Sequence, residues 1–440
     1  MELEQRILSR IVPTAEQASS IQEKADRLKH LVEEYVGNHG IDVEARFAGS
    51  FSKNTYLSDP DLDIFLMFPP DIAPEDLKRI GLQAGDDILH GERMFSDHPY
   101  TRGRFEGVDV DMVPCYHIDS TEDLKSAVDR TPFHTRFINS RLDTDGCNQV
   151  RLLKKFMKGI GAYGAEQDSR GFSGYLCELL VVKYGTFDGV LEAASKWRYG
   201  TVIEIDGKGP RMDGALVVYD PVDNRRNVAS AVHTDTLGLF VAASRAYLTE
   251  PREEFFFPRS RPVLSGEDLS ALADRHGTKV VAVRFDRPDA AIEDNLQSQL
   301  WKTQIALAKK LGDMSFNVIR AAHTMDDEHM SVAFELETDT LSRTHLHRGP
   351  PVWVKTEPFL EKWRGNLYGE PFIEDGTWNV VAERQYTSAA EMLSAEAGIS
   401  GIGKELDIGR MKVMDHVAAL SEANPAMLSE LLDPRLPWEF

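Results

Sequence analysis

The feature that most constrains the fold of this chain is a short apolar run that follows two aspartates. Residues 64–68, Ile-Phe-Leu-Met-Phe, lie between prolines and are typical of a buried strand. Asp61 and Asp63 stand at its entrance, and side chains at i and i+2 of a strand point to the same face. Charges beside a buried strand are costly unless they are paired or hold a metal. The pattern therefore predicts a strand whose entrance is either a solvated edge or a metal-binding site.

A second predicted strand repeats the pattern. Residues 105–118 alternate and are rich in valine, and Asp109 and Asp111 lie one residue apart within them. If the two strands are neighbours, three or four carboxylates converge at one end of a sheet. Oxygen ligands suit Mg²⁺, and two such ions would clamp the attacking and leaving oxygens of a phosphoryl transfer. One pair alone is more often a solvated strand edge, but two pairs favour a metal site.

The dipeptide Gly49-Ser50 precedes the first aspartate pair by about eleven residues. A short helix is predicted at 51–57, and the free backbone N–H groups at such a helix start bind phosphate oxygens. Ser50 can add a hydroxyl, and Lys53 adds a cation one turn along. A plain N-cap role for Ser50 is compatible with this function.

Composition indicates a globular protein of several domains. The chain has 440 residues, 42% of them hydrophobic and 28% charged, which is too long for one ordinary core. The formal charge of −21 argues against bulk attraction to nucleic acid but leaves room for a local basic face. No apolar stretch could span a membrane and no signal core follows the N-terminus, so we expect a cytoplasmic protein. Three widely spaced cysteines predict neither a disulfide framework nor a zinc site.

Patterning along the chain predicts a multidomain α+β fold. Residues 1–134 read as a small mixed α/β domain, and residues 135–255 read as mostly helical. Residues 256–440 contain a second sheet domain of split βαβ type, with less regular segments after it. The elements expected with most support are helices at 20–40, 74–89 and 295–312, strands at 43–49, 62–68, 105–118 and 278–288, and a hairpin at 316–337 that turns at Asp326-Asp327.

The predicted helix at 148–161 has two distinct faces. Its apolar side chains are Val150, Leu152, Leu153, Phe156, Met157 and Ile160. The cations Arg151, Lys154, Lys155 and Lys158 fall together on the other face. A solvated basic face is common, but in so acidic a chain it favours anion binding.

Several single residues allow two interpretations. His134, after Pro132, is on its own more typical of a structural histidine. Tyr163 could pack in a core or stack on a base or sugar. Arg226 could belong to a surface ion pair or could read a base edge. The histidine-containing segment 343–351 favours a loop that touches RNA backbone over a zinc site, because no further ligand has suitable spacing.

Taken together, these residues resemble the DNA polymerase β nucleotidyltransferase superfamily, which has a Gly-Ser turn, a short helix, an acidic-x-Asp strand and a third Asp on a later strand. Longer segments are similar to the archaeal, class I CCA-adding enzymes. Segments 126–134 and 170–180 are the most specific of them. The others are 49–57, 108–116, 150–156, 163–166, 220–229, 347–351 and 371–391.

The resemblance implies a tRNA nucleotidyltransferase, which builds or repairs the 3′ CCA end of tRNA from CTP and ATP without a template, using two Mg²⁺ ions. It implies a polymerase β-like head at 1–134, a helical neck at 135–255 that recognises the base, and a ferredoxin-like, tRNA-binding body and tail at 256–440. A homodimer is left open. The implied catalytic and metal residues are Asp61, Asp63 and Asp111, and the implied nucleotide-binding residues are Gly49, Ser50, Lys53, His134, Lys154, Tyr163 and the base-reading Arg226.

The chain departs from the family pattern at two positions. Asp61 stands where the family usually has Glu, and Lys53 stands where it usually has Arg, so a point charge replaces a bidentate fork. Two alternatives remain open. One is another template-independent nucleotidyltransferase, of the poly(A) polymerase or oligoadenylate synthetase type. The other is a catalytically dead relative that binds RNA, against which the intact acidic residues argue.

Overall fold

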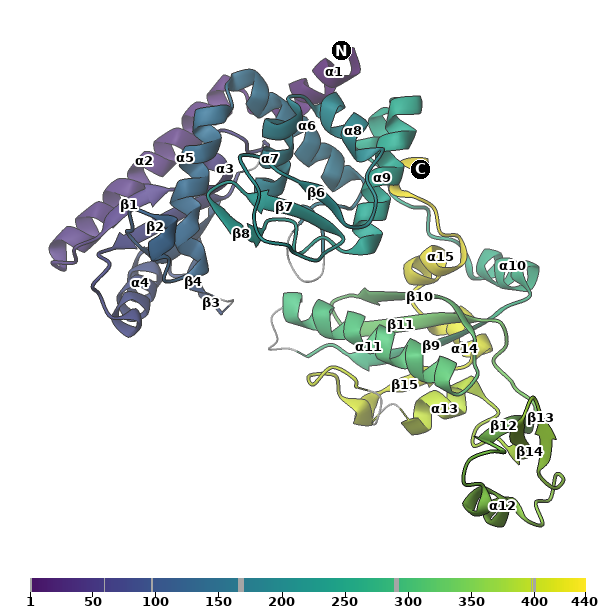
Figure 1. Ribbon diagram of the computed structural model, residues 1–440. Coiled ribbons are helices and arrows are strands. Elements are labelled where there is room, and N and C mark those ends of the chain that lie inside the picture. Colours follow the sequence, from purple (N-terminus) through teal and green to yellow (C-terminus); the bar gives the residue numbers. More distant parts are fainter. Residues whose placement is uncertain are drawn as a thin grey trace. The chain divides into compact units, whose positions relative to one another are not determined.

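The computed structural model describes residues 2–440 except 59, 96–97, 165–169, 289–292, 397 and 399–400. The chain divides into two compact units, Met1–Arg259 with Leu436–Phe440, and Ser260–Arg435. Each combines helices with sheets (Figure 1). The boundaries expected after residues 134 and 255 stay predictions. Within the described residues, no helix is both long enough and apolar enough to cross a membrane.

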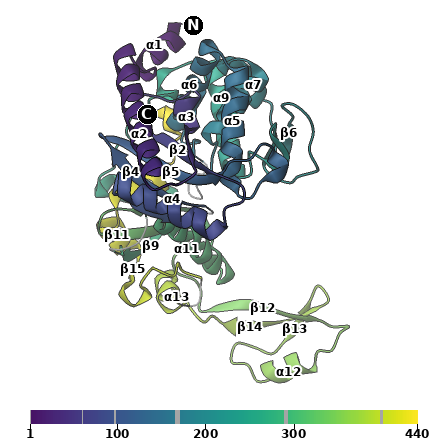
Figure 2. The ribbon, with the colours of Figure 1, turned by 90° about the vertical axis from the view of Figure 1, so that its left-hand side faces the viewer.

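Unit 1 begins with helix α1 (Glu2–Ile11) and a five-stranded sheet in the order β1-β2-β5-β4-β3. Helices α2 (Ala15–Asn38) and α4 (Pro74–Leu89) cover one face of this sheet (Figure 2). The strands are β1 (Glu44–Phe47), β2 (Leu62–Phe68), β3 (Glu92–Phe95), β4 (Pro99–Phe105) and β5 (Val108–Tyr116). The strand predicted at 62–68 and the helix predicted at 74–89 are confirmed.

The register of the central strands decides where the aspartates face. Strands β2 and β5 are parallel neighbours, and Asp63 lies opposite Asp111. Leu62 and its alternate residues on β2 pack into the core beneath α2 and α4. Because side chains alternate across a strand, Asp63 and Asp111 face the side that these helices leave open. The strand predicted at 105–118 begins only at Val108, because residues 106 and 107 form the tight turn from β4.

The remainder of unit 1 is mainly helical and surrounds one apolar core with Phe156 at its centre. Its helices are α5 (Thr131–Arg141), α6 (Thr144–Gly159), α7 (Gly174–Tyr184), α8 (Phe187–Ala194) and α9 (Thr234–Thr249). A three-stranded sheet, which the sequence analysis missed, interrupts the helices in the order β6-β7-β8. Its strands are β6 (Thr201–Ile203), β7 (Leu216–Asp220) and β8 (Asp223–Asn227). The C-terminus also belongs to this unit, because Trp438 stacks on Phe255.

Unit 2 contains a four-stranded antiparallel sheet in the order β10-β11-β9-β15. The strand predicted at 278–288, the helix predicted at 295–312 and the hairpin turn at Asp326-Asp327 are confirmed. The sheet elements are β9 (Lys279–Asp286), α11 (Glu293–Asp313), β10 (Val318–Met325), β11 (His329–Leu336) and β15 (Lys412–Met414). Helices α10 (Gly266–His276), α13 (Ala389–Glu396), α14 (His416–Glu422) and α15 (Pro425–Leu432) pack against it.

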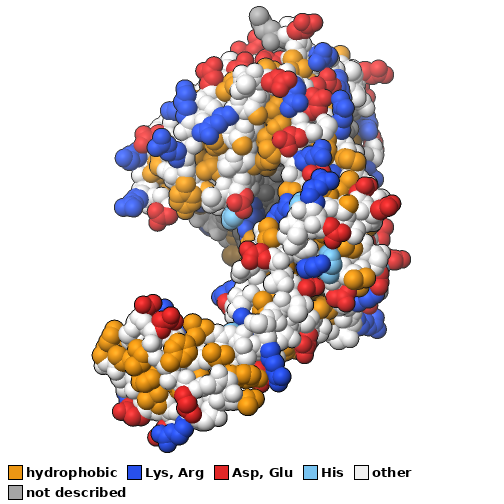
Figure 3. All heavy atoms as spheres, turned by 90° about the vertical axis from the view of Figure 1, so that its right-hand side faces the viewer, with side chains coloured by type: hydrophobic (Ala, Val, Ile, Leu, Met, Phe, Trp, Pro, Cys, Tyr) orange, Lys and Arg blue, Asp and Glu red, His pale blue; other side chains and the backbone are white. Residues whose placement is uncertain are grey.

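A smaller sheet in unit 2 has the order β12-β14-β13 and carries helix α12 (Glu357–Trp363). Its strands are β12 (Thr344–Pro351), β13 (Phe372–Glu374) and β14 (Thr377–Glu383). The loop predicted at 343–351 is therefore wrong, because these residues pair with β14 and His347 packs on Phe359 and Trp363. Hydrophobic side chains gather on the surface of this part of the chain (Figure 3). Trp353, which follows β12, is 75% exposed.

Candidate active site

Three carboxylates gather on the open face of the five-stranded sheet. Asp63 and Asp111 are paired in register, and Asp61 precedes β2 by one residue. Burial, followed by the charges of Asp111 and Asp61, raises the pKa of Asp63 to about 6. Burial and the charges of Asp109 and Asp111 also raise the pKa of Asp61. These groups therefore repel one another, and a bound cation would relieve that repulsion.

An arginine holds the third aspartate. Arg102 on β4 donates from Nε and Nη2 to the two carboxylate oxygens of Asp111, at 2.8 and 2.9 Å. Asp109 instead pairs with Arg104 at 2.8 Å and is exposed, although its charge still reaches Asp61. Among the residues described, no three carboxylate, imidazole or thiol groups are gathered tightly enough to hold an ion as they stand. The donor chemistry of Asp61, Asp63 and Asp111, oxygen only, nevertheless fits Mg²⁺.

Gly49 brings the Gly-Ser turn against Asp63. Its φ is +63°, and a Cβ atom at this position would lie 1.7 Å from Asp63 Oδ2. The N–H of Ala48 also donates to the carbonyl oxygen of Asp63, at 2.9 Å. Helix α3 (Gly49–Ser52) begins here, so the helix predicted at 51–57 lies too far along the chain. The half-buried Ser50 follows Gly49 at the first turn, so this turn and the carboxylates form one site.

Two of the predicted nucleotide ligands meet at a buried glutamate on α7. Glu178 is completely buried and accepts from Lys53 Nζ at 2.5 Å, Lys154 Nζ at 3.0 Å and Thr55 Oγ1 at 2.6 Å. Burial raises the pKa of Glu178, but the two ammonium groups outweigh this effect and lower it to about 2. The carboxylate is therefore charged. Tyr163 lies beside this group, because a Cβ on Gly174 would be 2.9 Å from Tyr163 Oη and 3.5 Å from Lys154 Nζ.

Two of the four cations on the predicted basic face of the helix at 148–161 are not solvated. Lys154 and Arg151 are buried, each only 3% exposed. Arg151 donates to the carbonyl oxygen of Tyr56 at 2.8 Å and to the Asn54 side chain at 2.8 Å. Both cations join α6 to the segment that follows α3. This part of the polar face therefore meets protein partners, whereas Lys155 is half-buried and Lys158 is exposed.

The other two predicted ligands meet at a second buried carboxylate, Asp220 at the end of β7. His134 Nε2 and Arg226 Nη1 each lie 2.9 Å from Asp220 Oδ2. Tyr175 Oη donates to Asp220 Oδ1 at 3.1 Å, and its ring stacks on His134 with centroids 3.9 Å apart. Tyr175 also lies near the first cluster, because Lys53 Nζ is 5.6 Å from its ring centroid. The two clusters are therefore adjacent.

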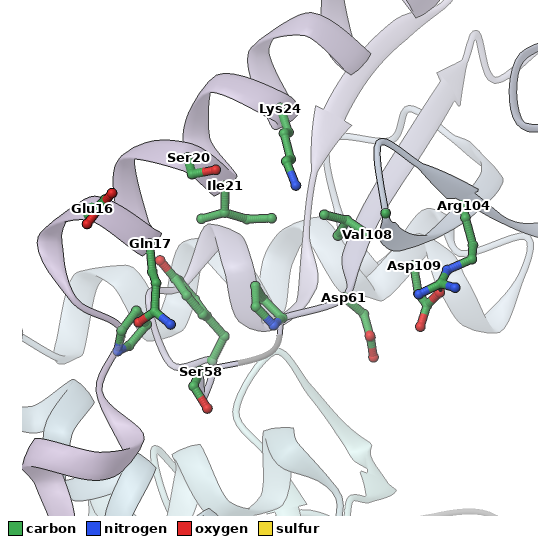
Figure 4. A pocket seen from close by; sticks show the side chains of 14 residues that line it. Glu16, Gln17, Ser20, Ile21, Lys24, Ser58, Asp61, Arg104, Val108 and Asp109 are labelled. Carbon is green, nitrogen blue, oxygen red and sulfur yellow. Dashed lines mark ion pairs between the residues drawn. The ribbon is translucent and has the colours of Figure 1, made fainter.

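A cavity of about 570 Å³ lies next to Asp61, which forms part of its lining (Figure 4). It lies between the first turns of α2 and the turn from β4 to β5, and Lys24 points into it from α2. The predicted nucleotide ligands do not line it. The lining residues are Pro13, Glu16, Gln17, Ser20, Ile21, Lys24, Tyr56, Ser58, Pro60, Asp61, Arg104, Gly107, Val108 and Asp109.

The structure thus brings together all the site residues predicted from sequence, within unit 1. It adds four residues that the sequence analysis missed, namely Arg102, Tyr175, Glu178 and Asp220. Tyr175 and Glu178 lie within segment 170–180, already noted for its specific resemblance, and their spacing of one helical turn was the available signal. Asp220 begins segment 220–229, which also carries the resemblance, whereas Arg102 lies outside every such segment.

Comparison with known families agrees with this geometry. The nucleotidyltransferase domain family matches residues 26–134, which include the five-stranded sheet and the three aspartates. The family described as "tRNA nucleotidyltransferase, second domain" matches residues 148–257, and "CCA-adding enzyme, C-terminal domain" matches residues 276–411. The fold and the site therefore define a nucleotidyltransferase head that is followed by further domains.

Comparison with single proteins gives the family. The CCA-adding enzyme of Methanoregula boonei is 40% identical over 92% of this chain and 88% of its own length. That of Haloarcula marismortui is 33% identical over 98% of both chains. The chain belongs to the CCA-adding enzymes, a family of nucleotidyltransferases with archaeal members. A solved cytoplasmic RNA terminal U-transferase, 14% identical, aligns over 60% of this chain and 98% of its own with a TM-score of 0.45.

Proposed function

We propose that the protein adds the 3′-terminal CCA sequence to tRNA from CTP and ATP, without a nucleic-acid template, and releases pyrophosphate. The observation that carries the proposal is the pairing of Asp63 with Asp111 against the Gly49 turn. Two clusters of cationic side chains lie next to it, Lys53 with Lys154 around Glu178, and His134 with Arg226 around Asp220. Carboxylates for divalent ions beside cations for a triphosphate are the parts that nucleotidyl transfer requires.

Each part of the site has a separate task. Asp61, Asp63 and Asp111 would hold two Mg²⁺ ions once Arg102 releases Asp111. When bound, the ions would lower the pKa of the attacking tRNA hydroxyl and offset charge on the leaving pyrophosphate. The other residues orient the nucleotide. The N–H groups at Gly49 and Ser50 face the phosphates, and the cluster of Lys53 and Lys154 around Glu178 binds the triphosphate.

Arg226 is placed to read the base. Asp220 engages one of its nitrogens, and with the side chain 39% exposed its other donors remain free to reach a base edge. Replacing it by alanine (R226A) should lower kcat/KM for both nucleotides by about 10–100-fold and relax the choice between CTP and ATP. Single-turnover incorporation of each nucleotide measures this. Arg225→Ala is the matched control: Arg225 is 64% exposed and pairs with Asp223, and its removal should leave the choice intact.

Unit 2 supplies a further surface. We assign its larger sheet the ferredoxin-like arrangement, because the order β10-β11-β9-β15 with antiparallel neighbours is that of a split βαβ fold. We propose that residues 1–134 form the catalytic head, 135–255 a neck that reads the nucleotide, and 256–440 the body and tail that hold tRNA. Duplex RNA is recognised mainly by shape and backbone contacts, which suits an acidic protein with local binding surfaces.

Extension of a tRNA transcript that lacks CCA tests the proposed function, with addition of three nucleotides as the expected result. A melting experiment tests the alternative of an inactive RNA-binding relative. Mg²⁺ with CTP should raise the Tm of the intact protein, because a ligand that binds only the folded state stabilises it. An inactive relative without a site would show no shift. Long, indiscriminate A tails would instead indicate the poly(A) polymerase alternative.

A further inference from the structure

Glu178 has no part in the transfer chemistry, yet it is fully buried among the proposed triphosphate ligands. It joins three elements: Lys53 comes from the segment after α3, Lys154 from α6 and Glu178 itself from α7. Thr55 completes the group, because it donates to Glu178 and accepts from Lys154 at 3.0 Å. Charge-assisted hydrogen bonds of this kind fix side chains firmly in a buried site.

The charges of this cluster do not balance. One carboxylate faces two lysine side chains, so Glu178 cannot neutralise both of them when they are protonated, and burial lowers the pKa of Lys154. All three Lys154 protons are engaged, by Glu178, Thr55 Oγ1 and the Thr55 carbonyl oxygen, whereas among the described residues Lys53 Nζ has a single acceptor, at 2.5 Å. Excess buried charge is costly unless a counter-ion completes the site. The cluster is therefore prepared for an anion, and Lys53 still has protons to donate.

The described groups around the two lysines do not supply the missing negative charge, which leaves that role to a ligand. Asp63 is close enough for the Lys53 charge to affect it, but the two make no direct contact, and Asp63 belongs to the carboxylate site. His134 is engaged by Asp220. The thiol of Cys177 next to Glu178 is buried and protonated, because burial raises its pKa to about 12. No described carboxylate other than Glu178 pairs with either lysine.

We propose that Glu178 is a positioning residue for nucleotidyl transfer, which holds Lys53 and Lys154 together at a site that the triphosphate of either CTP or ATP completes. This inference rests on the proposed function. It predicts that Glu178 acts equally on both nucleotides, because they share the triphosphate. It also predicts that Glu178 has no influence on the binding of tRNA.

The variant Glu178→Gln separates this role from mere packing. Glutamine keeps the shape but loses the charge, and its amide N–H₂ would face an ammonium group. A buried ammonium without an acceptor loses its proton or turns outward, and either change takes it from the triphosphate. The KM for CTP and the KM for ATP should each rise at least about tenfold, by the same factor, while the KM for tRNA stays within about twofold.

Glu335→Gln is the matched control. Glu335 is also a buried carboxylate, 1% exposed, which accepts from Thr278 Oγ1 at 2.7 Å and Arg320 Nε at 2.7 Å, but it lies in unit 2. Its replacement should lower the Tm to a similar extent and leave both nucleotide KM values unchanged. Melting of each variant with and without Mg²⁺ and CTP gives a second readout, and the ligand-induced rise should shrink only in Glu178→Gln.

The outcomes are distinct. Equal rises in the two nucleotide KM values, with tRNA binding intact, support the proposal. Unchanged nucleotide KM values in a folded Glu178→Gln variant would overturn it, as would an equal rise in the KM for tRNA. If the wild-type protein failed to extend tRNA, the proposed function would fall. The loss of the CTP-induced melting shift in Glu178→Gln would still decide whether Glu178 positions a triphosphate.

Discussion

Asp63→Asn should abolish nucleotide addition and, in the absence of metal, make the protein more stable at pH 8. The loss of activity follows because Asp63 lies between the other two carboxylates and cannot be replaced as an ion ligand by a neutral amide. We expect a fall in kcat of at least about 10²–10³-fold. The gain in stability follows from the burial of the carboxylate in the folded protein and from the repulsion by Asp111 and Asp61.

The pH dependence of that gain has a definite direction. The folded-state pKa of Asp63 is about 6, above the ordinary value of 3.8. The folded protein therefore binds the proton more tightly than the unfolded chain, and stability falls as pH rises from about 4 through 6. At pH 8 the cost reaches up to about 3 kcal/mol, which asparagine avoids. Below pH 4 the advantage of the variant should vanish.

Thermal melting at pH 4 and pH 8, with EDTA and then with Mg²⁺, measures this effect. Added Mg²⁺ should stabilise the wild-type protein at pH 8 and leave Asp63→Asn unchanged. Asp109→Asn is the matched control, because Asp109 belongs to the same strand pair but is 58% exposed and pairs with Arg104. It should keep its activity and its Tm. An Asp63→Asn protein that transfers nucleotides at a normal rate would rule out the three-carboxylate site.

Gly49→Ala should be almost as damaging to activity, although it adds only a methyl group. The new Cβ would lie 1.7 Å from Asp63 Oδ2, so the carboxylate must leave its position. The φ of +63° adds backbone strain of about 1 kcal/mol. We expect a fall in kcat of about 10²-fold or more, together with a modest loss of stability.

Gly40→Ala separates the clash from the strain. Gly40 has nearly the same φ, +62°, but a Cβ there would meet nothing within 4 Å. Its replacement should cost a similar strain energy and leave kcat unchanged. Steady-state kinetics and melting of the two variants side by side provide the test. Equal kinetics for Gly49→Ala and Gly40→Ala would show that the Gly49–Asp63 contact does not position the carboxylate.

Local patterns were sufficient to predict the elements that carry the carboxylates. Strand β2 could be predicted to the residue because prolines bound an unbroken apolar run, and α4 because Pro74 starts an amphipathic helix. The common face of Asp61 and Asp63, and that of Asp109 and Asp111, followed from the two-residue period of strands. That period does not say which strands pair. The predicted convergence of the carboxylates required β2 and β5 to be neighbours, and only their parallel pairing in the structure shows this.

Contacts between distant residues could not be predicted in the same way. Glu178 binds Lys53, which lies 125 residues away, and no local pattern marks such a partner. The helical wheel placed Lys154 on a polar face correctly, but it could not tell whether that face meets water or protein. The missed sheet has strands of only three to five residues, too short for a periodic signal.

The most direct test of the central claim is addition to three tRNA transcripts, ending before CCA, after C and after CC. Each is incubated with Mg²⁺ and with labelled CTP, labelled ATP or both, and the products are resolved to single nucleotides. We predict that all three are completed to CCA and no further, and that ATP is used only after CC. Addition of A to the transcript that ends before CCA, or tails that run past CCA, would contradict the account.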